Sequence, residues 1–193
     1  MKLAALFSGG KDSTYAIHLA KKLSHSVDVL LTLYPHSDES HLLHHPNIKF
    51  TTLQSESMGI PQLIEEIPSV DNEAEFKKLE KLITLAKENH SIEGIVHGGI
   101  LSKYQKDNFS LICQKNDLEI ISPLWNKNPE SYMKELLDEN FEYIISSVSC
   151  DGLDDSWLGQ KIDKNGLKTL ENLQNKFGFN LNFEGGEAET FVT

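Results

Sequence analysis

The chain has 193 residues, with 18 lysine and arginine residues against 29 aspartate and glutamate residues, for a net charge of −11. Apart from histidine, its basic side chains are all lysine. An acidic surface without arginine is a poor electrostatic match for a nucleic-acid backbone, so we expect no direct contact with nucleic acid. Acidic composition also serves solubility, and it therefore weakens a tRNA-binding hypothesis without excluding it. The length suits one α/β domain with a small appendage.

Cysteine usage and the N-terminal residues indicate the compartment. Cys113 and Cys150 form no metal-ligand spacing, which fits a reduced cytosolic protein. Lys2 precedes a strand-like apolar run that is too short for a signal peptide, and no apolar run approaches membrane-spanning length. We expect a cytoplasmic protein with no membrane partner.

The first segment joins an apolar run, a glycine turn and a helical pattern. Residues 3–7 predict a buried strand, and residues 11–23 carry apolar side chains at helical spacing. Glycines let the backbone approach an oxyanion closely, and the first amides of the helix point at it with the positive end of the dipole. The segment therefore predicts an anion site formed by Ser8, Gly9, Gly10, Lys11 and Ser13.

The spacing of this loop differs from that of the usual P-loop. A P-loop has a glycine five positions before Gly-Lys and a serine or threonine after the lysine. Here Ala5 stands five positions before Gly10, and Asp12 follows the lysine. Residues 8–13 instead resemble the pyrophosphate loop of the N-type ATP pyrophosphatases, which cleave ATP between the α- and β-phosphates. The alternative is an ordinary glycine turn capped by Asp12 or Ser13.

The next segments predict a second strand and a polar loop. Residues 27–33 form a continuous apolar run, and open α/β sheets bind ligands just beyond strand ends, so Leu33 and Tyr34 are predicted adenine neighbours. The histidine-rich segment that follows is either a flexible polar loop or, as the less favoured reading, a zinc site. No cysteine joins the group, which comprises His36, His41, His44 and His45.

The rest of the chain alternates between strand and helix patterns. Residues 48–53 predict a third strand, and residues 61–66 predict one or two helical turns. Further helices are expected at 73–89, 102–116, 129–139 and 163–177, and further strands at 94–97, 119–121 and 143–148. This order predicts a doubly wound, mainly parallel sheet with a smaller C-terminal α+β portion. We expect a nucleotide-binding domain at 1–125 and an acceptor-binding portion at 126–193.

Several motifs follow the loop in a fixed order. The most specific are the Tyr104-Gln105 pair and the segment from Glu184 to Thr190. The others are His44 with Pro46-Asn47, Met58-Gly59-Ile60-Pro61, Gly98 with Ile100 and Ser102, Pro123-Leu124-Trp125, and Gly152-Leu153 with Trp157-Leu158-Gly159. Over residues 3–192 this order resembles the diphthine–ammonia ligase family, the ATP pyrophosphatases that complete diphthamide on translation elongation factor 2.

The resemblance implies an ATP-dependent amide ligase. In such an enzyme a substrate carboxylate attacks the α-phosphorus, pyrophosphate leaves, and ammonia then displaces AMP from the acyl-adenylate. The implied partners are translation elongation factor 2 bearing diphthine and ammonium, and the implied cofactors are ATP and Mg²⁺. A homodimer is left open.

Adenylation depends chiefly on positioning and charge neutralisation, which assigns roles on the nucleotide side. Lys11 would offset the charge of the leaving pyrophosphate. Asp12 would hold Mg²⁺, because magnesium favours one or two carboxylates plus phosphate oxygens and water. The alternative is that Asp12 only caps the helix. The predicted nucleotide site comprises Ser8, Gly9, Gly10, Lys11, Asp12, Ser13, Leu33, Tyr34, His44 and Gly98.

The acceptor side rests on the segment near the end of the chain. Glu184, Glu187 and Glu189 would bind ammonium, deprotonate it, or hold the trimethylammonium of diphthine, with Thr190 binding substrate beside them. A surface acidic hairpin is the alternative. Parallel topology would bring residues 184–190 to the same carboxyl edge of the sheet as the loop.

Aromatic side chains extend the acceptor hypothesis. Tyr104 and Gln105 would orient substrate from a helix N-terminus, although Tyr104 could equally be packing. Trp125 and Trp157 would offer a cation–π surface for a quaternary ammonium, or belong to the core.

Some positions depart from the family pattern. Family members usually carry glycine at Phe183, an aromatic residue at Ala188, an acidic residue at Lys103 and arginine at Asn108. Without a basic side chain, position 108 lacks the positive charge that would contact a phosphate or carboxylate.

Three rival functions remain. The first is amidation of a small-molecule carboxylate, and the second is a non-catalytic nucleotide-sensing module. The third and weaker one is tRNA thiolation, which would require a basic surface and catalytic cysteines.

Overall fold

The structure is a computed structural model that describes residues 1–35, 47–67 and 72–193. Its contacts divide the chain into two compact units, Met1–Trp125 and Asn126–Thr193, and each is described by itself. The side chains considered for a zinc site, His36, His41, His44 and His45, lie outside the described residues. Within the described part, no helix has both the length and the apolar character needed to cross a membrane.

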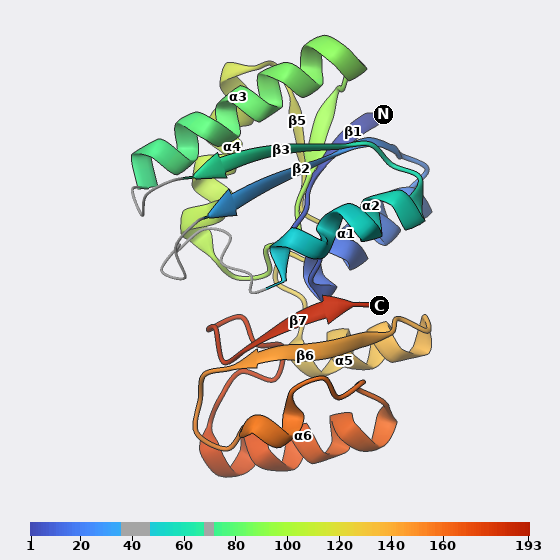
Figure 1. Cartoon of the computed structure of the whole chain (residues 1–193), viewed down its shortest axis with the longest axis vertical. Helices are drawn as coiled ribbons and strands as arrows, with labels where there is room; N and C mark the ends of the chain where they lie inside the picture. The colour runs from blue at the N-terminus through green and yellow to red at the C-terminus, as the bar shows by residue number, and fades with distance from the viewer. Residues whose placement is uncertain (36–46, 68–71) are drawn as a thin grey trace. The chain divides into compact units, whose positions relative to one another are not determined.

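The first unit is built on a five-stranded sheet (Figure 1). Its strands, in the order β3-β2-β1-β4-β5, are all paired in parallel with their neighbours. In chain order they are β1 (Lys2–Leu6), β2 (Ser26–Pro35), β3 (Gln62–Ile67), β4 (Gly94–Val96) and β5 (Glu119–Ile121).

Helices cover both faces of this sheet (Figure 1). Successive side chains of a strand point to opposite faces. Ala4 and Leu6 of β1 therefore pack with the helices on one face, and Leu3 and Ala5 pack with those on the other. The first pair joins the cluster with α3 (Asn72–His90) and α4 (Lys103–Lys115), and the second joins the cluster with α1 (Lys11–Lys22) and the end of α2 (Thr51–Met58). The predicted doubly wound parallel sheet is confirmed.

The third strand predicted at residues 48–53 is wrong. The segment forms a single turn of 3₁₀-helix, η1 (Ile48–Phe50), that continues into α2. Its apolar residues do not mark a buried strand face, because Leu53 is 61% exposed. Thr51 is buried instead, and its hydroxyl donates to the Ile48 carbonyl at 2.7 Å. Gly59, in the left-handed conformation with φ 64°, ends α2.

The helical turns predicted at residues 61–66 are also wrong, since this segment is the edge strand β3. An edge strand is only partly covered, so its sequence need not show a continuous apolar run. Glu65 fits there because Lys78 and Lys81 of α3 lie 2.6 and 3.0 Å from its carboxylate. These bonds hold the pKa of Glu65 below its usual value.

The second unit is a small α+β assembly (Figure 1). It comprises α5 (Pro129–Asp138), β6 (Tyr143–Val148), the 3₁₀ turn η2 (Asp155–Trp157), α6 (Lys164–Phe177) and β7 (Ala188–Val192). The side chains of Asn128 and Asp163 cap α5 and α6 by accepting from Ser131 N and Gly166 N. β6 and β7 pair antiparallel in a sheet of their own.

Candidate functional site

The topology of the first unit creates a switch point between β1 and β4. From β1 the chain continues outward through β2 and β3 on one side, whereas β4 continues to β5 on the other. In open α/β sheets ligands bind in the crevice at the carboxyl ends of the two strands that flank such a point. The segments that follow these ends are Phe7–Gly10 and His97–Gly99.

The glycine loop after β1 has the geometry expected of an anion site. Gly9 has φ +80°, a conformation that favours glycine. Gly10 is the N-cap of α1, and no side chain caps the helix there. Ser13 Oγ accepts from Ser8 N at 3.3 Å, donates to the Gly10 carbonyl at 3.1 Å and lies 3.2 Å from Ser8 Oγ. The hydroxyls brace the loop at the N-terminus of α1, the end of a helix whose amides and dipole favour an anion.

Lys11 and Asp12 place opposite charges at the start of α1. Lys11 is 2% exposed, and its Nζ lies 3.0 Å from Asp12 Oδ2. The Asp12 side chain is 33% exposed. A buried ammonium needs compensating negative charge, which Asp12 provides here and a phosphate would provide with ligand bound.

Asp12 also suits a magnesium ion. The described residues contain no group of three or more histidine, cysteine or acidic side chains that could hold a metal. Magnesium bound to nucleotides needs fewer protein ligands, because one or two carboxylates act together with phosphate oxygens and water. A single accessible carboxylate at the mouth of an anion loop fits that requirement.

Gly98 lies directly against the first turn of α1. A Cβ on Gly98 would lie 2.5 Å from the Asp12 carbonyl carbon and 2.7 Å from Ser13 N. These are backbone atoms that cannot move aside without shifting the helix. Glycine at this position therefore allows the β4 loop to pack on the pyrophosphate loop, while a contact between Gly98 and nucleotide stays a prediction.

His97 is a structural residue that the sequence did not single out. Its ring is 2% exposed, its Nδ1 accepts from Gly99 N at 3.1 Å, and its Nε2 lies 2.6 Å from Ser122 Oγ. Because Nδ1 accepts, the neutral ring carries its proton on Nε2 and donates to Ser122. His97 thus links the ends of β4 and β5. Burial, with the nearby charge of Lys106, lowers the pKa of His97 to about 4.

We expect His97 to make the folded protein sensitive to acid. Below about pH 6.5 the unfolded chain protonates this histidine while the folded chain does not, so the free energy of unfolding falls until the folded pKa of about 4 is reached. The full loss is about 3 kcal/mol by linkage. Urea unfolding at about pH 7 and about pH 5 should show about 2 kcal/mol of this loss, because pH 5 lies only about 1.5 units below the unfolded pKa. His97→Gln should flatten this dependence, whereas His90→Gln, near the end of α3, should leave it unchanged. Equal slopes in wild type and His97→Gln would contradict the assignment.

The other residues predicted to bind nucleotide lie in several environments. Leu33 is buried in the cluster beneath α3, so its side chain packs in the core. Tyr34 is half-buried near the end of β2. His44 lies outside the described residues. The adenine contacts therefore stay a prediction.

The aromatic residues predicted for the acceptor side are only partly described. Tyr104 and Gln105 stand in the first turn of α4, but their side chains are outside the described part of the structure. Trp157 is buried in the second unit, as the core alternative predicted. Lys106 Nζ lies 4.0 Å from the Trp125 ring centroid, so Trp125 already takes part in a cation–π contact.

The glutamate segment lies in the second unit, where Glu187 organises a turn. Glu187 Oε1 accepts from Asn180 N at 2.9 Å and from Asn180 Nδ2 at 2.6 Å, and Oε2 accepts from Gly185 N at 2.9 Å. Glu184 and Glu189 are half-buried, and Thr190 is buried in β7. β7 pairs with β6 and is not a strand of the parallel sheet, so the approach of residues 184–190 to the carboxyl edge of that sheet stays a prediction.

Phe183 occupies a backbone conformation that suits glycine. Its φ is +62°, in the left-handed region, yet its side chain is 5% exposed and its ring centroid lies 6.5 Å from that of Phe179. The strain of about 1–3 kcal/mol is offset by the burial of a large aromatic side chain. The backbone here would suit glycine, and phenylalanine contributes a buried ring in its place.

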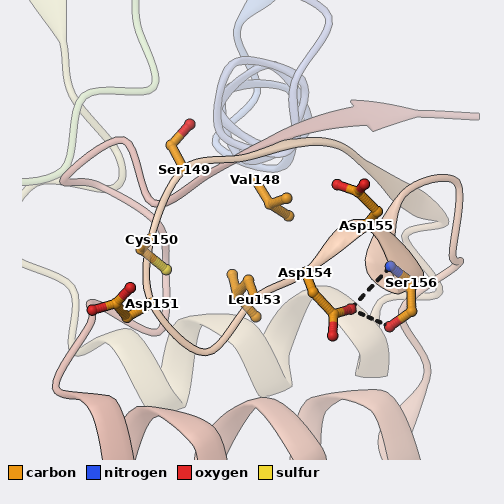
Figure 2. A pocket seen from close by; sticks show the side chains of 8 residues that line it. All are labelled: Val148, Ser149, Cys150, Asp151, Leu153, Asp154, Asp155 and Ser156. Atoms are coloured by element: carbon orange, nitrogen blue, oxygen red, sulfur yellow. Dashed lines mark hydrogen bonds between the residues drawn. The ribbon is translucent and has the colours of Figure 1, made fainter.

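The loop after β6 lines an open pocket of about 740 Å³ (Figure 2). The sequence indicates only the Gly152-Leu153 motif and Cys150 in this loop, and it predicts no pocket. Figure 2 shows the loop curving around the pocket, with Asp154 hydrogen-bonded to Ser156. The lining residues are Val148, Ser149, Cys150, Asp151, Leu153, Asp154, Asp155 and Ser156. Ser149 N donates to the Glu187 carbonyl at 2.8 Å, so the pocket loop and the glutamate segment are directly joined.

Both cysteine thiols are held in the protonated form. Burial raises the pKa of Cys113 to about 11, with a further contribution from Glu119. Burial and the negative charges of Glu187 and Asp151 raise the pKa of Cys150. Neither residue is an activated thiolate, which argues against the thiolation hypothesis.

Comparison with known proteins gives consistent matches. Family models described as the diphthamide synthase N-terminal domain and C-terminal domain match residues 1–120 and 128–193. The diphthine–ammonia ligase of Bos taurus is 34% identical, covering 100% of this chain and 78% of the relative. The diphthine–ammonia ligase of Homo sapiens is 33% identical with the same coverage.

A more distant similarity is found among solved structures. The crystal structure of a predicted subunit of tRNA methyltransferase from Methanocaldococcus jannaschii aligns with 91% of this chain and 87% of its own, at 14% identity and a TM-score of 0.42. That similarity is too low to bear on function. The two family models and the relatives together confirm the predicted family and the predicted class of enzyme, a ligase. The chain belongs to the diphthamide synthase family.

Proposed function

We propose that this chain is an ATP-dependent amide ligase that converts diphthine to diphthamide on translation elongation factor 2. The diphthine carboxylate attacks the α-phosphorus of ATP, pyrophosphate leaves, and ammonia then displaces AMP from the acyl-adenylate. The observation that carries the proposal is the glycine loop that leads from β1 into the N-terminus of α1 at the sheet's switch point. It occurs in a chain that matches diphthine–ammonia ligases along its whole length.

The nucleotide half of the reaction is assigned to the first unit. Ser8, Gly9, Gly10 and Ser13 cradle the β- and γ-phosphates, which become the leaving pyrophosphate. Lys11 offsets the negative charge that develops on that group, and its burial strengthens the interaction because little water screens it. Mg²⁺ would be held by Asp12, where it would neutralise phosphate charge.

The acceptor half is assigned to the second unit. Glu187 and Asp151 both lie close enough to Cys150 to raise its pKa, so negative charge is concentrated around the pocket loop and the glutamate segment. An acidic site of this kind favours ammonium or the trimethylammonium group of diphthine. We assign Glu184 and Glu189 to cation binding and deprotonation, and Glu187 to holding the turn that carries Glu184. Thr190 completes the substrate contacts that we propose in this unit. Tyr104 and Gln105, which belong to the first unit, stay assigned to substrate binding as a prediction.

The remaining assignments follow from the same proposal. We propose ammonium as the nitrogen donor and a cytoplasmic location, where elongation factor 2 is found. A homodimer is compatible with the proposal. The thiol pKa values and the acidic composition both support a protein substrate over tRNA.

The products of the reaction test the proposal directly. Purified protein with Mg-ATP, ammonium and diphthine-bearing elongation factor 2 should release AMP and pyrophosphate, because the loop lacks P-loop spacing. Mass spectrometry of the elongation factor should show the change from a carboxyl group to an amide. Release of ADP and orthophosphate would overturn the assigned cleavage position. Nucleotide binding with no turnover on any carboxylate would favour a nucleotide-sensing module.

A further inference from the structure

We propose that Gln54, on α2, is a positioning residue for the pyrophosphate loop, holding the Gly9 carbonyl so that the N–H of Gly10 faces the phosphates of ATP. The proposal rests on the proposed function, and it adds a residue that lies outside the loop motif. Gln54 is half-buried and stands 45 residues after Gly9 in the chain.

Two observations place Gln54 against the loop. Its Nε2 donates to the Gly9 carbonyl at 3.0 Å, and because that oxygen can only accept, the amide nitrogen has to face it. A Cβ on Gly9 would collide with Gln54 Oε1 and would lie 3.0 Å from Thr51 Cγ2. Position 9 therefore favours glycine for its φ of +80°, and a side chain there would have to displace the Gln54 amide.

The hydrogen bond fixes the orientation of one peptide unit. The peptide between Gly9 and Gly10 is trans, so its C=O and N–H point in opposite directions. A glycine in the left-handed region rotates at little cost, and the loop by itself does not select one orientation of this peptide. With the carbonyl held by Gln54, the N–H of Gly10 points away from α2 and joins the first amides of α1 as a donor to phosphate.

A buried polar network holds α2 rigidly enough for this role. Gln62 Nε2 on β3 donates to Thr32 Oγ1 at 2.7 Å and to Thr51 Oγ1 at 2.9 Å. Thr32 Oγ1 in turn donates to the Phe7 carbonyl at 2.8 Å, directly before the loop. Thr32 and Thr51 are both fully buried. The network therefore ties the start of α2 to the strand that carries the loop, so Gln54 is preorganised.

Two substitutions of Gln54 remove its hydrogen bond to the Gly9 carbonyl, one with an added negative charge and one without. Gln54→Glu keeps the shape of the side chain but replaces the donor by an oxygen that repels the Gly9 carbonyl. Gln54→Met removes the donor without adding charge. If the glutamate variant fails to fold, the methionine variant still tests whether the hydrogen bond matters for phosphate binding. The matched control is Gln114→Glu, an exposed position at the end of α4, which leads to the opposite edge of the sheet.

The measurement is calorimetric titration with three probes, namely ATP, inorganic pyrophosphate and AMP, each with Mg²⁺. Loss of one hydrogen bond and the donor it orients should weaken ATP and pyrophosphate about tenfold in both Gln54 variants. AMP affinity should stay within about twofold, because AMP lacks the β- and γ-phosphates, and Gln114→Glu should match wild type. A merely structural residue would instead lower the melting temperature without this selective loss.

The possible outcomes distinguish a failure of the role of Gln54 from a failure of the proposed ligase function. Unchanged pyrophosphate affinity in both Gln54 variants, or an equal loss for AMP, would overturn the role of Gln54 alone. Failure of the wild-type protein to bind either ATP or pyrophosphate would overturn the proposed function, and the role of Gln54 with it.

Discussion

Replacing Lys11 or Asp12 by alanine should lower turnover by at least ~100-fold, the scale typical of losing one transition-state stabiliser. Lys11 is an almost fully buried cation at the start of α1, so its charge acts on the leaving pyrophosphate with little screening. In the proposed reaction, Asp12 would supply the carboxylate for magnesium. Steady-state release of pyrophosphate with saturating Mg-ATP measures both effects.

The fold should survive these two substitutions. Asp12 is partly exposed and tolerates the loss of Lys11, so the far-ultraviolet circular dichroism spectrum of Lys11→Ala should not change. Asp12→Ala takes a compensating carboxylate from the buried Lys11 ammonium, so this variant should melt at a lower temperature while the spectrum of its folded state stays the same. Lys21→Ala, at an exposed position in the last turn of the same helix, is the control and should retain wild-type turnover. Near wild-type turnover in either the Lys11 or the Asp12 variant would show that its assigned role is wrong.

The parts of the fold that could be predicted are those with strong local signals. The apolar run before Ser8, the glycines and the amphipathic pattern after them predict strand, turn and helix within one short stretch, and the structure contains all three. The long helix α3 repeats apolar residues at helical spacing over most of its length, and it lies where its periodicity places it. Local propensity and tertiary burial agree at these elements.

The misassigned elements are those where burial contradicts the local pattern. The spacing of Ile48, Phe50 and Leu53 indicates a strand, but the structure leaves Phe50 and Leu53 exposed on a helix. The paired acidic residues of β3 indicate a helix, but the lysines that accommodate Glu65 come from α3. Neither outcome is decided by residues close in sequence, so periodicity alone cannot predict it.

In the candidate site, too, the features set by local sequence could be predicted and those set by distant residues could not. The pyrophosphate loop is a contiguous motif, so its strand, glycine turn and helix could be predicted from the sequence, while its contacts with nucleotide stay a prediction. The partners of the loop, Gln54 and Gly98, come from distant segments, and only the assembled sheet places them against Gly9 and Asp12. Likewise, Glu187 could be recognised as part of an acidic motif, but not as the acceptor of three hydrogen bonds from Asn180 and Gly185.

Replacing Glu187 by glutamine should lower amide formation by orders of magnitude while leaving ATP affinity within about threefold of wild type, a difference below ~0.7 kcal/mol. Both oxygens of Glu187 accept hydrogen bonds, and glutamine retains only one acceptor oxygen. The new amide nitrogen would face a donor on Asn180 or Gly185, so the turn that carries Glu184 should lose its shape. The nucleotide site that we propose is formed by residues of the first unit and should be unaffected.

A substitution that leaves every charge in place tests the same geometry. A Cβ on Gly185 would lie 2.7 Å from Glu187 Oε1 and 2.9 Å from Asn180 Nδ2, so Gly185→Ala should displace the carboxylate and reproduce the loss of amidation. Glu189→Gln tests the neighbouring carboxylate in parallel. Glu80→Gln on α3 is the control, because its ion pair with Lys115 is long, at 3.8 Å, and partly exposed.

Titration with a non-hydrolysable ATP analogue beside the ligation assay decides between the two halves of the site. The acyl-adenylate should still form in the Glu187→Gln variant and accumulate, because the step that fails is the attack by ammonia. If nucleotide binding and ligation fell together, Glu187 would belong to the metal–phosphate site. The assignment of nucleotide binding to the first unit and acceptor binding to the second would then be wrong.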